Sequence, residues 1–206
     1  VYAFDNPNGY KYGEQVKINF TVKAVLSADG TVGNVTDGKT KLYIDGVEYT
    51  GTGSEKNIYG YEQTYTIPSS YISLGDHEYK IEYFDSDYYE DDTFILRNTI
   101  TKMDPELKVN LDKSECNYGD DIYITVDAPD TNNLVIEDYK DDAETEKYAA
   151  NIEYDHWDSS SGMDVYKYKN PKAGNHYIKV SYNGSTYYDA ASKKMVAYEK
   201  KEKHYA

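Results

Sequence analysis

Apolar and polar residues alternate along much of the chain, which is the pattern of half-buried β-strands. The even positions from Val16 to Val22 are apolar, and the odd positions between them are polar. An apolar residue at every second position places one face of a strand against a core. Residues 42–49 alternate around Asp45-Gly46, a dipeptide typical of a two-residue hairpin turn, and therefore predict a β-hairpin.

The same pattern predicts strands in both halves of the chain. They are expected at 60–67, 76–84 and 93–100, and again at 106–112, 121–127, 133–139, 148–155, 163–169, 175–182 and 193–199. No segment keeps a 3.6-residue period over three turns, and the acidic stretch 138–149 is expected to form a loop. About seven short strands per roughly 100 residues predict an all-β fold with a two-sheet sandwich. An open five- or six-stranded barrel is the lesser alternative.

One unit is present twice. Residues 12–18 (YGEQVKI) correspond to 118–124 (YGDDIYI), and residues 75–83 (GDHEYKIEY) correspond to 174–182 (GNHYIKVSY). The first pair is offset by 106 positions and the second by 99, so the middle of the second unit is seven residues shorter. Length differences of this kind are typical of surface loops. With Pro105 near the junction, we expect two tandem antiparallel β-sandwich domains at 1–102 and 103–206.

Composition supports a folded, acidic β-protein. The 206 residues include 37 Asp and Glu against 22 Lys and Arg, a net charge of −15, but also 26 tyrosines. Disordered acidic chains lack aromatic residues, so this acidity does not indicate disorder. The charge argues against nucleic acid and anionic membranes as partners. The single Cys116 excludes an intrachain disulfide and a cysteine-based zinc site.

Two further absences concern the context of the chain. No apolar run is long enough for a transmembrane helix, so no membrane insertion is expected within this segment. The chain begins without a signal peptide and within a predicted strand, so we expect it to be a segment of a longer protein.

The repeated motifs carry a resemblance to a known family. Each unit opens with Tyr-Gly-Glu or Tyr-Gly-Asp (Tyr12, Tyr118) and closes with Gly-x-His-x-x-Lys-Ile/Val-x-Tyr, followed five residues later by Tyr-Tyr. These motifs resemble the bacterial-type immunoglobulin-like repeats of adhesin-like cell-surface proteins, especially those of gut and rumen methanogenic archaea. The resemblance covers nearly the whole chain, twice.

The resemblance implies both a location and a role. It implies a secreted, extracellular protein at the cell surface, with its anchor outside this segment and further immunoglobulin-like repeats beside it. It implies a stalk or contact surface for adhesion, with a glycan or protein of a host or partner cell as the ligand. The family has no shared catalytic residues, so no enzyme is expected.

His77 and His176 occupy equivalent positions in the two units. A histidine that repeats with the fold is expected to be structural, with a partly buried ring bonded to a neighbouring loop. Tyr83 and Tyr182 are expected to be packing or corner residues in the same way.

An acidic loop, residues 85–92, is the candidate metal site. It contains five carboxylates in eight residues, whereas the matching loop of the second unit keeps only Asp189. Closely spaced carboxylates suit calcium, although the spacing does not match an EF-hand. Calcium is therefore the one cofactor considered, with a plain solvated loop as the alternative. The candidate ligands are Asp85, Asp87, Asp91 and Asp92.

Tyr154 and Trp157 form the candidate ligand site. Trp157, the only tryptophan, lies at the mouth of a Ser/Gly loop with Asp155 and Asp158 beside it. An aromatic face can stack on a sugar ring while carboxylates bind its hydroxyls, which predicts a carbohydrate-binding module as the alternative function. The competing interpretation is that Trp157 packs in the core of the second unit.

Two covalent modifications are also considered. Asn19, Asn34 and Asn183 begin N-glycosylation sequons, the first on the polar face of a strand and the other two in predicted turns. An isopeptide bond between Lys17 and Asn98 is disfavoured, because the alternation points Lys17 to solvent, where nothing would lower its pKa.

The sequence contains no nucleophile elbow, phosphate-binding loop or metalloprotease motif. We therefore expect an adhesive or structural segment first and a carbohydrate-binding module second. A catalytic or accessory enzyme domain is the least favoured alternative, because a sandwich of this size offers little cleft.

Overall fold

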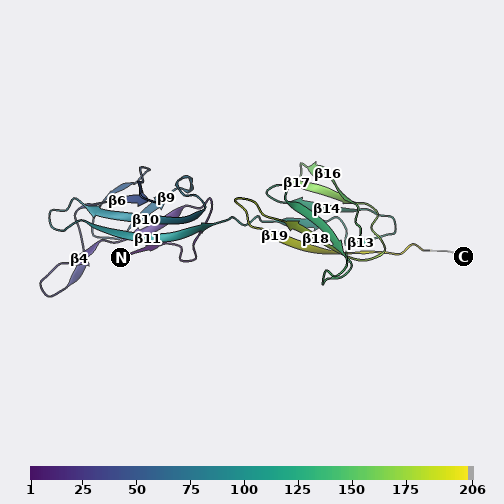
Figure 1. Ribbon diagram of the computed structural model, residues 1–206, viewed down its shortest axis with the longest axis horizontal. Helices are drawn as coiled ribbons and strands as arrows, with labels where there is room; N and C mark the ends of the chain where they lie inside the picture. The colour runs from purple at the N-terminus through teal and green to yellow at the C-terminus, as the bar shows by residue number, and fades with distance from the viewer. Residues whose placement is uncertain (204–206) are drawn as a thin grey trace. The chain divides into compact units, whose positions relative to one another are not determined.

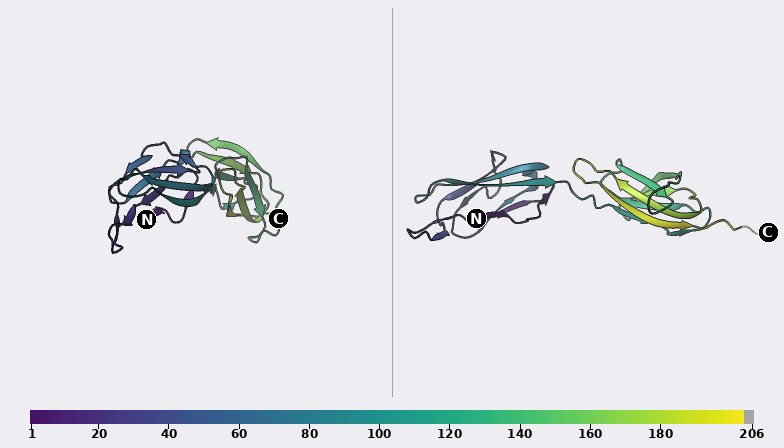
Figure 2. Two further views of the ribbon diagram at one scale, coloured as in Figure 1. Left: turned by 60° about the vertical axis from the view of Figure 1, so that its left-hand side comes forward. Right: turned by 60° about the horizontal axis from the view of Figure 1, so that its bottom comes forward.

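The computed structural model describes residues 1–203, and the chain divides into two compact units, Val1–Met103 and Asp104–Ala206. Each unit consists of two facing β-sheets, visible in the views of Figures 1 and 2. Within the described residues, the one helical segment is the 3-10 turn η1, Ser69–Tyr71. No described helix has the length and apolarity needed to cross a membrane.

The first unit pairs a three-stranded sheet with a larger one. The smaller sheet has the order β1-β3-β9, and the larger has the order β2-β11-β10-β6-β7 with β8 also paired to β6. A separate hairpin, β4–β5, projects from the sandwich. The strand bounds are β1 Tyr2–Phe4, β2 Tyr10–Lys11, β3 Val16–Phe20, β4 Lys23–Val25, β5 Val32–Asn34, β6 Lys39–Ile44, β7 Val47–Glu48, β8 Glu55–Asn57, β9 Gln63–Ile67, β10 Gly75–Phe84 and β11 Asp92–Thr101.

The second unit has two four-stranded sheets, β12-β14-β17-β16 and β13-β19-β18-β15. The strand bounds are β12 Lys108–Leu111, β13 Glu115–Cys116, β14 Ile122–Asp127, β15 Leu134–Tyr139, β16 Ile152–Asp158, β17 Met163–Tyr168, β18 Gly174–Tyr182 and β19 Ala191–Glu199. Of the acidic stretch 138–149, for which a loop was predicted, residues 140–149 form a loop, whereas Asp138 and Tyr139 are the last residues of β15.

The topology of both units is immunoglobulin-like. In each, the first strand is split between the sheets: β1 and β12 run antiparallel to β3 and β14, while β2 and β13 run parallel to β11 and β19. The remaining strands follow the order of an immunoglobulin-like sandwich. The predicted fold class is confirmed, and the barrel alternative is wrong because the sheets of each unit remain separate, with free edges.

Each unit has its own core, and tyrosine fills much of it. The even positions from Val16 to Val22 are buried, as the alternation predicted. Tyr65, Tyr79 and Tyr182 are almost completely buried, so tyrosine serves here as a large core residue. The apolar clusters of the two units contain no residue in common.

The strand registers explain the seven-residue difference between the units. Ile44 lies opposite Tyr79, and Asp138 lies opposite Ile178, which fixes the correspondence of β6 with β15. The connection before this strand is long in the first unit, residues 21–38, and short in the second, residues 128–133. This connection is therefore twelve residues longer in the first unit (18 against 6), and it contains the hairpin β4–β5, which the sequence interpretation did not predict. The second unit is five residues longer from Asp138 to Ile178 than the first is from Ile44 to Tyr79 (40 positions against 35), which leaves the net difference of seven.

Candidate functional site

The exposed aromatic residues of β16 form the best-defined candidate ligand surface. The side chains of Trp157 and Tyr154 are 57% and 52% exposed. The interpretation that Trp157 packs in the core is therefore wrong, because it lies on an edge strand with one neighbour, β17.

A β-bulge places these two aromatic residues on one face of the sheet. Trp157 pairs with Asp164 and Tyr154 pairs with Tyr166, and the register shifts between Tyr154 and His156. Directly paired residues share a face, and Asp164 and Tyr166 are two positions apart. Without the extra residue of the bulge, two side chains three positions apart would point to opposite faces.

The platform, defined as Tyr154, Trp157, Asp164 and Tyr166, continues the inner face of its sheet. Tyr166 pairs with the buried core residue Ile124, so the platform residues point to the same side as the core. The aromatic residues remain accessible because they lie at the edge of the sandwich. One side of the platform therefore borders the apolar core, and the other side is accessible to solvent.

Polar groups of the platform suit a hydroxyl-rich ligand. The ring of Tyr154 contacts that of Tyr166 edge-on at 5.5 Å, and its hydroxyl donates to Asp164 Oδ1 at 3.3 Å. Partial burial and then the Asp164 carboxylate raise the pKa of both phenols, so both stay protonated donors at neutral pH. Sequence reasoning missed Asp164 and Tyr166, because only the bulged register brings them to Trp157.

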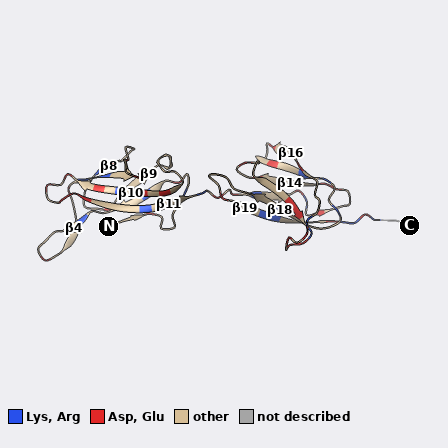
Figure 3. Ribbon diagram, viewed as in Figure 1, with Lys and Arg blue, Asp and Glu red and all other residues tan. Residues whose placement is uncertain are grey.

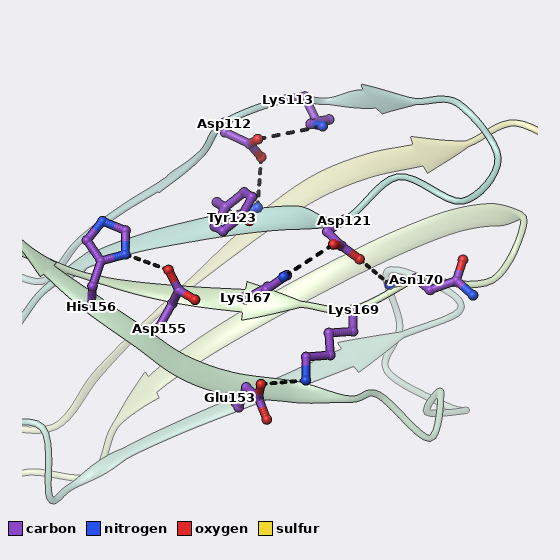
Figure 4. A network of polar contacts seen from close by, with 10 residues as sticks. All are labelled: Asp112, Lys113, Asp121, Tyr123, Glu153, Asp155, His156, Lys167, Lys169 and Asn170. Carbon is purple, nitrogen blue, oxygen red and sulfur yellow. Dashed lines mark hydrogen bonds and ion pairs between the residues drawn. The ribbon is translucent and has the colours of Figure 1, made fainter.

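The two carboxylates that the sequence placed beside Trp157 are already engaged. Asp155 Oδ2 lies 2.5 Å from His156 Nδ1 (Figure 4). Asp158 accepts from the Ser160 amide and from the hydroxyls of Ser160 and Ser161, and these bonds, led by Ser161, lower its pKa. Asp158 therefore holds the Ser/Gly loop in shape.

Other polar contacts tie the neighbouring strands of this sheet together. Asp121 lies between Lys167 Nζ, at 3.6 Å, and the Asn170 amide, which donates to it at 2.8 Å (Figure 4). Lys169 Nζ lies 2.6 Å from Glu153 Oε1. These contacts brace the hairpin β16–β17 that carries the platform.

The repeated histidines are structural in both units, as predicted. His77 Nδ1 lies 2.6 Å from Asp45 Oδ2, and its Nε2 lies 2.6 Å from the Ser73 carbonyl. A cavity of about 470 Å³ opens beside this pair, lined also by Arg97 and Asn98. The corresponding His176 is fully buried.

The surroundings of His176 form a buried polar cluster. Its Nδ1 lies 2.5 Å from Asp138 Oδ2, which also accepts from the Tyr168 hydroxyl at 2.5 Å, and its Nε2 lies 2.6 Å from the Lys172 carbonyl. Burial lowers the pKa of His176, but the bonds to Asp138 and Lys172 outweigh it, so the net shift is upward. Both ring nitrogens face acceptors, which stabilises the doubly protonated ring.

The repeated tyrosines are buried packing residues that also anchor a loop. The Tyr83 hydroxyl donates to the Asp37 carbonyl at 2.9 Å, and the Tyr182 hydroxyl donates to Asp130 Oδ2 at 3.0 Å. Each therefore ties the end of its strand to the loop before β6 or β15. This differs from an immunoglobulin tyrosine corner, where the tyrosine lies near the start of its strand.

Hydrogen bonds of Ser86 hold the acidic loop in shape. Ser86 Oγ donates to Asp37 Oδ2 at 2.9 Å and accepts from the amides of Tyr88 and Tyr89. Asp85 lies 3.6 Å from Lys39, and Asp92 accepts from the next amide. Among the described residues, no group of three or more histidine, cysteine or acidic side chains is arranged to hold a metal ion.

The sequon asparagines differ in accessibility. Asn34 and Asn183 are exposed, whereas Asn19 is half-buried and accepts from the Thr64 hydroxyl at 2.7 Å. Asn34 lies in β5 and not in a turn, because the unpredicted hairpin includes it, and its Nδ2 donates to the Gly60 carbonyl at 2.9 Å. Asn183 follows the end of β18, as expected for a turn.

The structure agrees with the sequence analysis that Lys17 and Asn98 are not placed to form an isopeptide bond. Lys17 is exposed on the outer face of β3, as the alternation predicted. Asn98 lies on β11 in the other sheet, where it pairs with the buried His77 and therefore faces inward. The side chains thus point in directions that keep them apart.

No protein-family model and no curated protein sequence matches the chain. Among solved structures, domains 4 and 5 of the S-layer protein SbsC are similar at 15% identity and a TM-score of 0.33, covering 97% of this chain and 96% of that one. The Escherichia coli adhesin FdeC is similar at 13% identity and a TM-score of 0.32, covering 97% and 63%. The Yersinia pseudotuberculosis adhesin InvE is similar at 12% identity and a TM-score of 0.32, covering 95% and 58%. Scores this low do not support an argument about function.

Proposed function

We propose that this chain is a tandem pair of immunoglobulin-like modules from an extracellular cell-surface protein, and that the pair acts in adhesion as a stalk and contact surface. The observation that carries the proposal is that two sandwiches of one plan each complete a core of their own. Their differences lie in the insertion β4–β5, the acidic loop and the free edge β16. A repeated frame with variable exposed parts suits binding and spacing better than catalysis.

The surface chemistry supports this role. A net charge of −15 keeps such modules soluble and mutually repelling, and both signs of charge occur on strands of each unit (Figure 3). Exposed tyrosines offer rigid contact area at a low cost in conformational entropy. The ligand is a glycan or protein of another cell, and no cofactor is needed for binding.

The test is a comparison of cell binding by beads that carry the whole chain and beads that carry bovine serum albumin at equal density. The proposal expects saturable binding that soluble chain competes away. Equal binding by both kinds of bead, or binding that soluble chain does not reduce, would contradict a contact role.

A second candidate function, carbohydrate binding, is favoured by the platform at β16. Trp157 and Tyr154 present aromatic faces on one side of an edge strand, and Asp164, the strand partner of Trp157, lies beside them as a hydroxyl acceptor. Stacking on a sugar ring needs such an exposed ring with a polar group beside it.

A polysaccharide array with and without calcium tests this second function. Saturable binding that Trp157→Ala abolishes and Tyr118→Ala preserves would support it, because Tyr118 is an equally exposed aromatic residue of the same unit. An array without binding, or equal losses in both variants, would exclude the platform as a sugar site.

A further inference from the structure

Two features of the first unit that the second unit lacks lie side by side. The hairpin β4–β5 is an insertion, and the acidic loop, residues 85–92, keeps a single carboxylate in the second unit. Both contribute walls to one cavity of about 210 Å³. Lys23, Ala24 and Val35 line it from the insertion, and Tyr89, Glu90 and Asp92 line it from the loop and the start of β11.

The hairpin exposes aliphatic side chains on both of its faces. Val25 and Val32 pair directly and are 61% and 60% exposed. Leu26 is 49% exposed and lies over Gly33, where a Cβ atom would come within 2.2 Å of Leu26 Cδ1. Neighbouring exposed aliphatic residues of this kind mark interaction surfaces.

The turn of the hairpin is held in shape without contributions from the sandwich. Asp29 Oδ1 accepts from the Thr31 amide at 3.0 Å, from the Thr31 hydroxyl at 2.6 Å and from the Ser27 hydroxyl. These bonds, led by that of Ser27, lower the pKa of Asp29 to about 2. The exposed valines are thus presented on an ordered ribbon.

The acidic loop adds negative charge that remains largely uncompensated. Among the described residues, Asp85 has an ion pair, with Lys39, whereas Asp87, Glu90 and Asp91 have none. Tyr88 is 80% exposed within this loop. The cavity-lining Lys23 is the single basic residue of the hairpin.

We propose that this surface, the hairpin pole (Val25, Leu26, Val32, Tyr88 and the acidic loop), binds a protein segment that alternates basic and apolar side chains. The aliphatic residues bury the apolar side chains, and the free carboxylates pair with the basic ones. A second copy of this chain is disfavoured as the partner, because the chain carries a net charge of −15 and a symmetric contact would bring one acidic loop against another. The inference rests on the proposed contact function and names one surface and one partner class for it.

The test measures the binding of a short fluorescein-labelled peptide of alternating lysine and leucine to the whole chain by fluorescence anisotropy. We expect saturable binding that weakens as salt is raised, and no binding of the matching glutamate–leucine peptide. The double variant Val25→Ser/Val32→Ser keeps every charge and should weaken binding about tenfold or more. The control Val47→Ser removes a 71% exposed valine from another hairpin of the same unit and should leave the affinity unchanged.

Neutralising the loop separates the two contributions. Asp87→Asn/Glu90→Gln/Asp91→Asn should weaken binding and flatten its salt dependence, while calorimetry shows that the unit still unfolds at its normal temperature. Equal affinity in wild type and in the serine double variant would overturn the proposal, as would the absence of binding or association of the chain with itself through the hairpin. Loss of cell adhesion by the beads with intact peptide binding would instead count against the proposed function alone.

Discussion

Glu199 is a buried carboxylate in the core of the second unit, where the first unit has an isoleucine. It is 0% exposed, and neither of its carboxylate oxygens has a hydrogen bond of normal geometry to a described residue. Glu199 pairs with Gly174, as Ile100 pairs with Gly75, so the two positions are equivalent. We predict that Glu199→Gln stabilises the second unit at neutral pH.

The pKa of Glu199 gives the sign of the effect. Burial raises it above the ordinary value, and the nearby Gly119 amide, His176 and Cys116 thiol offset this only in part. The folded state therefore prefers the protonated acid. Stability is full below the unfolded-state pKa and falls as the pH rises through the folded-state pKa.

The magnitude follows from the extra cost of a buried charge, because a glutamine at this position is also polar and differs from the ionised Glu199 by the charge alone. An unsatisfied buried polar group costs about 1–3 kcal/mol and a charged one more, so removing the charge should raise the free energy of unfolding by about 1–3 kcal/mol at neutral pH. For a domain of this size each kcal/mol raises Tm by about 4–8 °C. At acidic pH, where wild-type Glu199 is protonated, the two proteins should have nearly equal stability.

Scanning calorimetry of the whole chain measures the effect, since each unit has its own core. Trp157 fluorescence identifies the transition of the second unit, because this unit contains the only tryptophan. The exposed Glu146→Gln is the matched control and should change stability by less than about 0.5 kcal/mol. A lower Tm in Glu199→Gln at neutral pH would refute the reasoning, because it would mean that the carboxylate is a satisfied, stabilising anion.

Three further predictions concern the first unit. Gly38→Ala should lower its free energy of unfolding by about 2 kcal/mol or more in chemical denaturation, because φ is +86° and the added Cβ would lie 2.5 Å from the Tyr83 ring. Gly46→Ala, where φ is +82° but no atom lies within 4 Å of the added Cβ, should lower the free energy of unfolding by about 1–2 kcal/mol. An equal loss of stability in Gly38→Ala and Gly46→Ala would contradict the steric argument. Calcium should leave Tm unchanged, since the acidic loop gathers no ligand set, and a saturable rise in calorimetry would restore the metal site. Intact-mass spectrometry should show no loss of ammonia, because Lys17 and Asn98 point apart; a mass lower by one ammonia would reverse this.

The two β-sandwiches could be predicted from the sequence, because the alternation of apolar and polar residues indicates the strands and the repeated motifs indicate the two units. Alternation from Val16 onward fixed β3, and Asp45-Gly46 does form the predicted turn, with both residues at positive φ. The hairpin β4–β5 was not predicted because its apolar residues Val25 and Val32 face solvent. Its sequence therefore lacks the alternation of apolar and polar positions that indicates a half-buried strand.

The candidate ligand site was predicted only in part. Trp157 and Tyr154 stood out by composition, but their common face depends on one extra residue in β16. That bulge also places Asp164 on the face that Trp157 and Tyr154 share, whereas Asp155 contacts His156. A register shift of one residue exchanges the two faces of a strand, and alternation alone cannot locate it.

His77 and His176 make the same kinds of contact in the two units, but with aspartates at different positions of the fold. In both units the histidine Nε2 contacts the carbonyl of the residue four positions earlier. Its Nδ1 contacts an aspartate of the neighbouring strand in the sheet, Asp138 in β15, or of the turn after that strand, Asp45 after β6. These aspartates are not equivalent, because the register aligns Asp138 with Ile44 and not with Asp45. Both units therefore meet one physical demand, an acceptor for a buried imidazole, from different positions in the chain. A contact that both units make from different positions is a requirement of the fold. The partner contacts that we propose therefore involve features that the two units do not share, the hairpin pole of the first and the platform of the second.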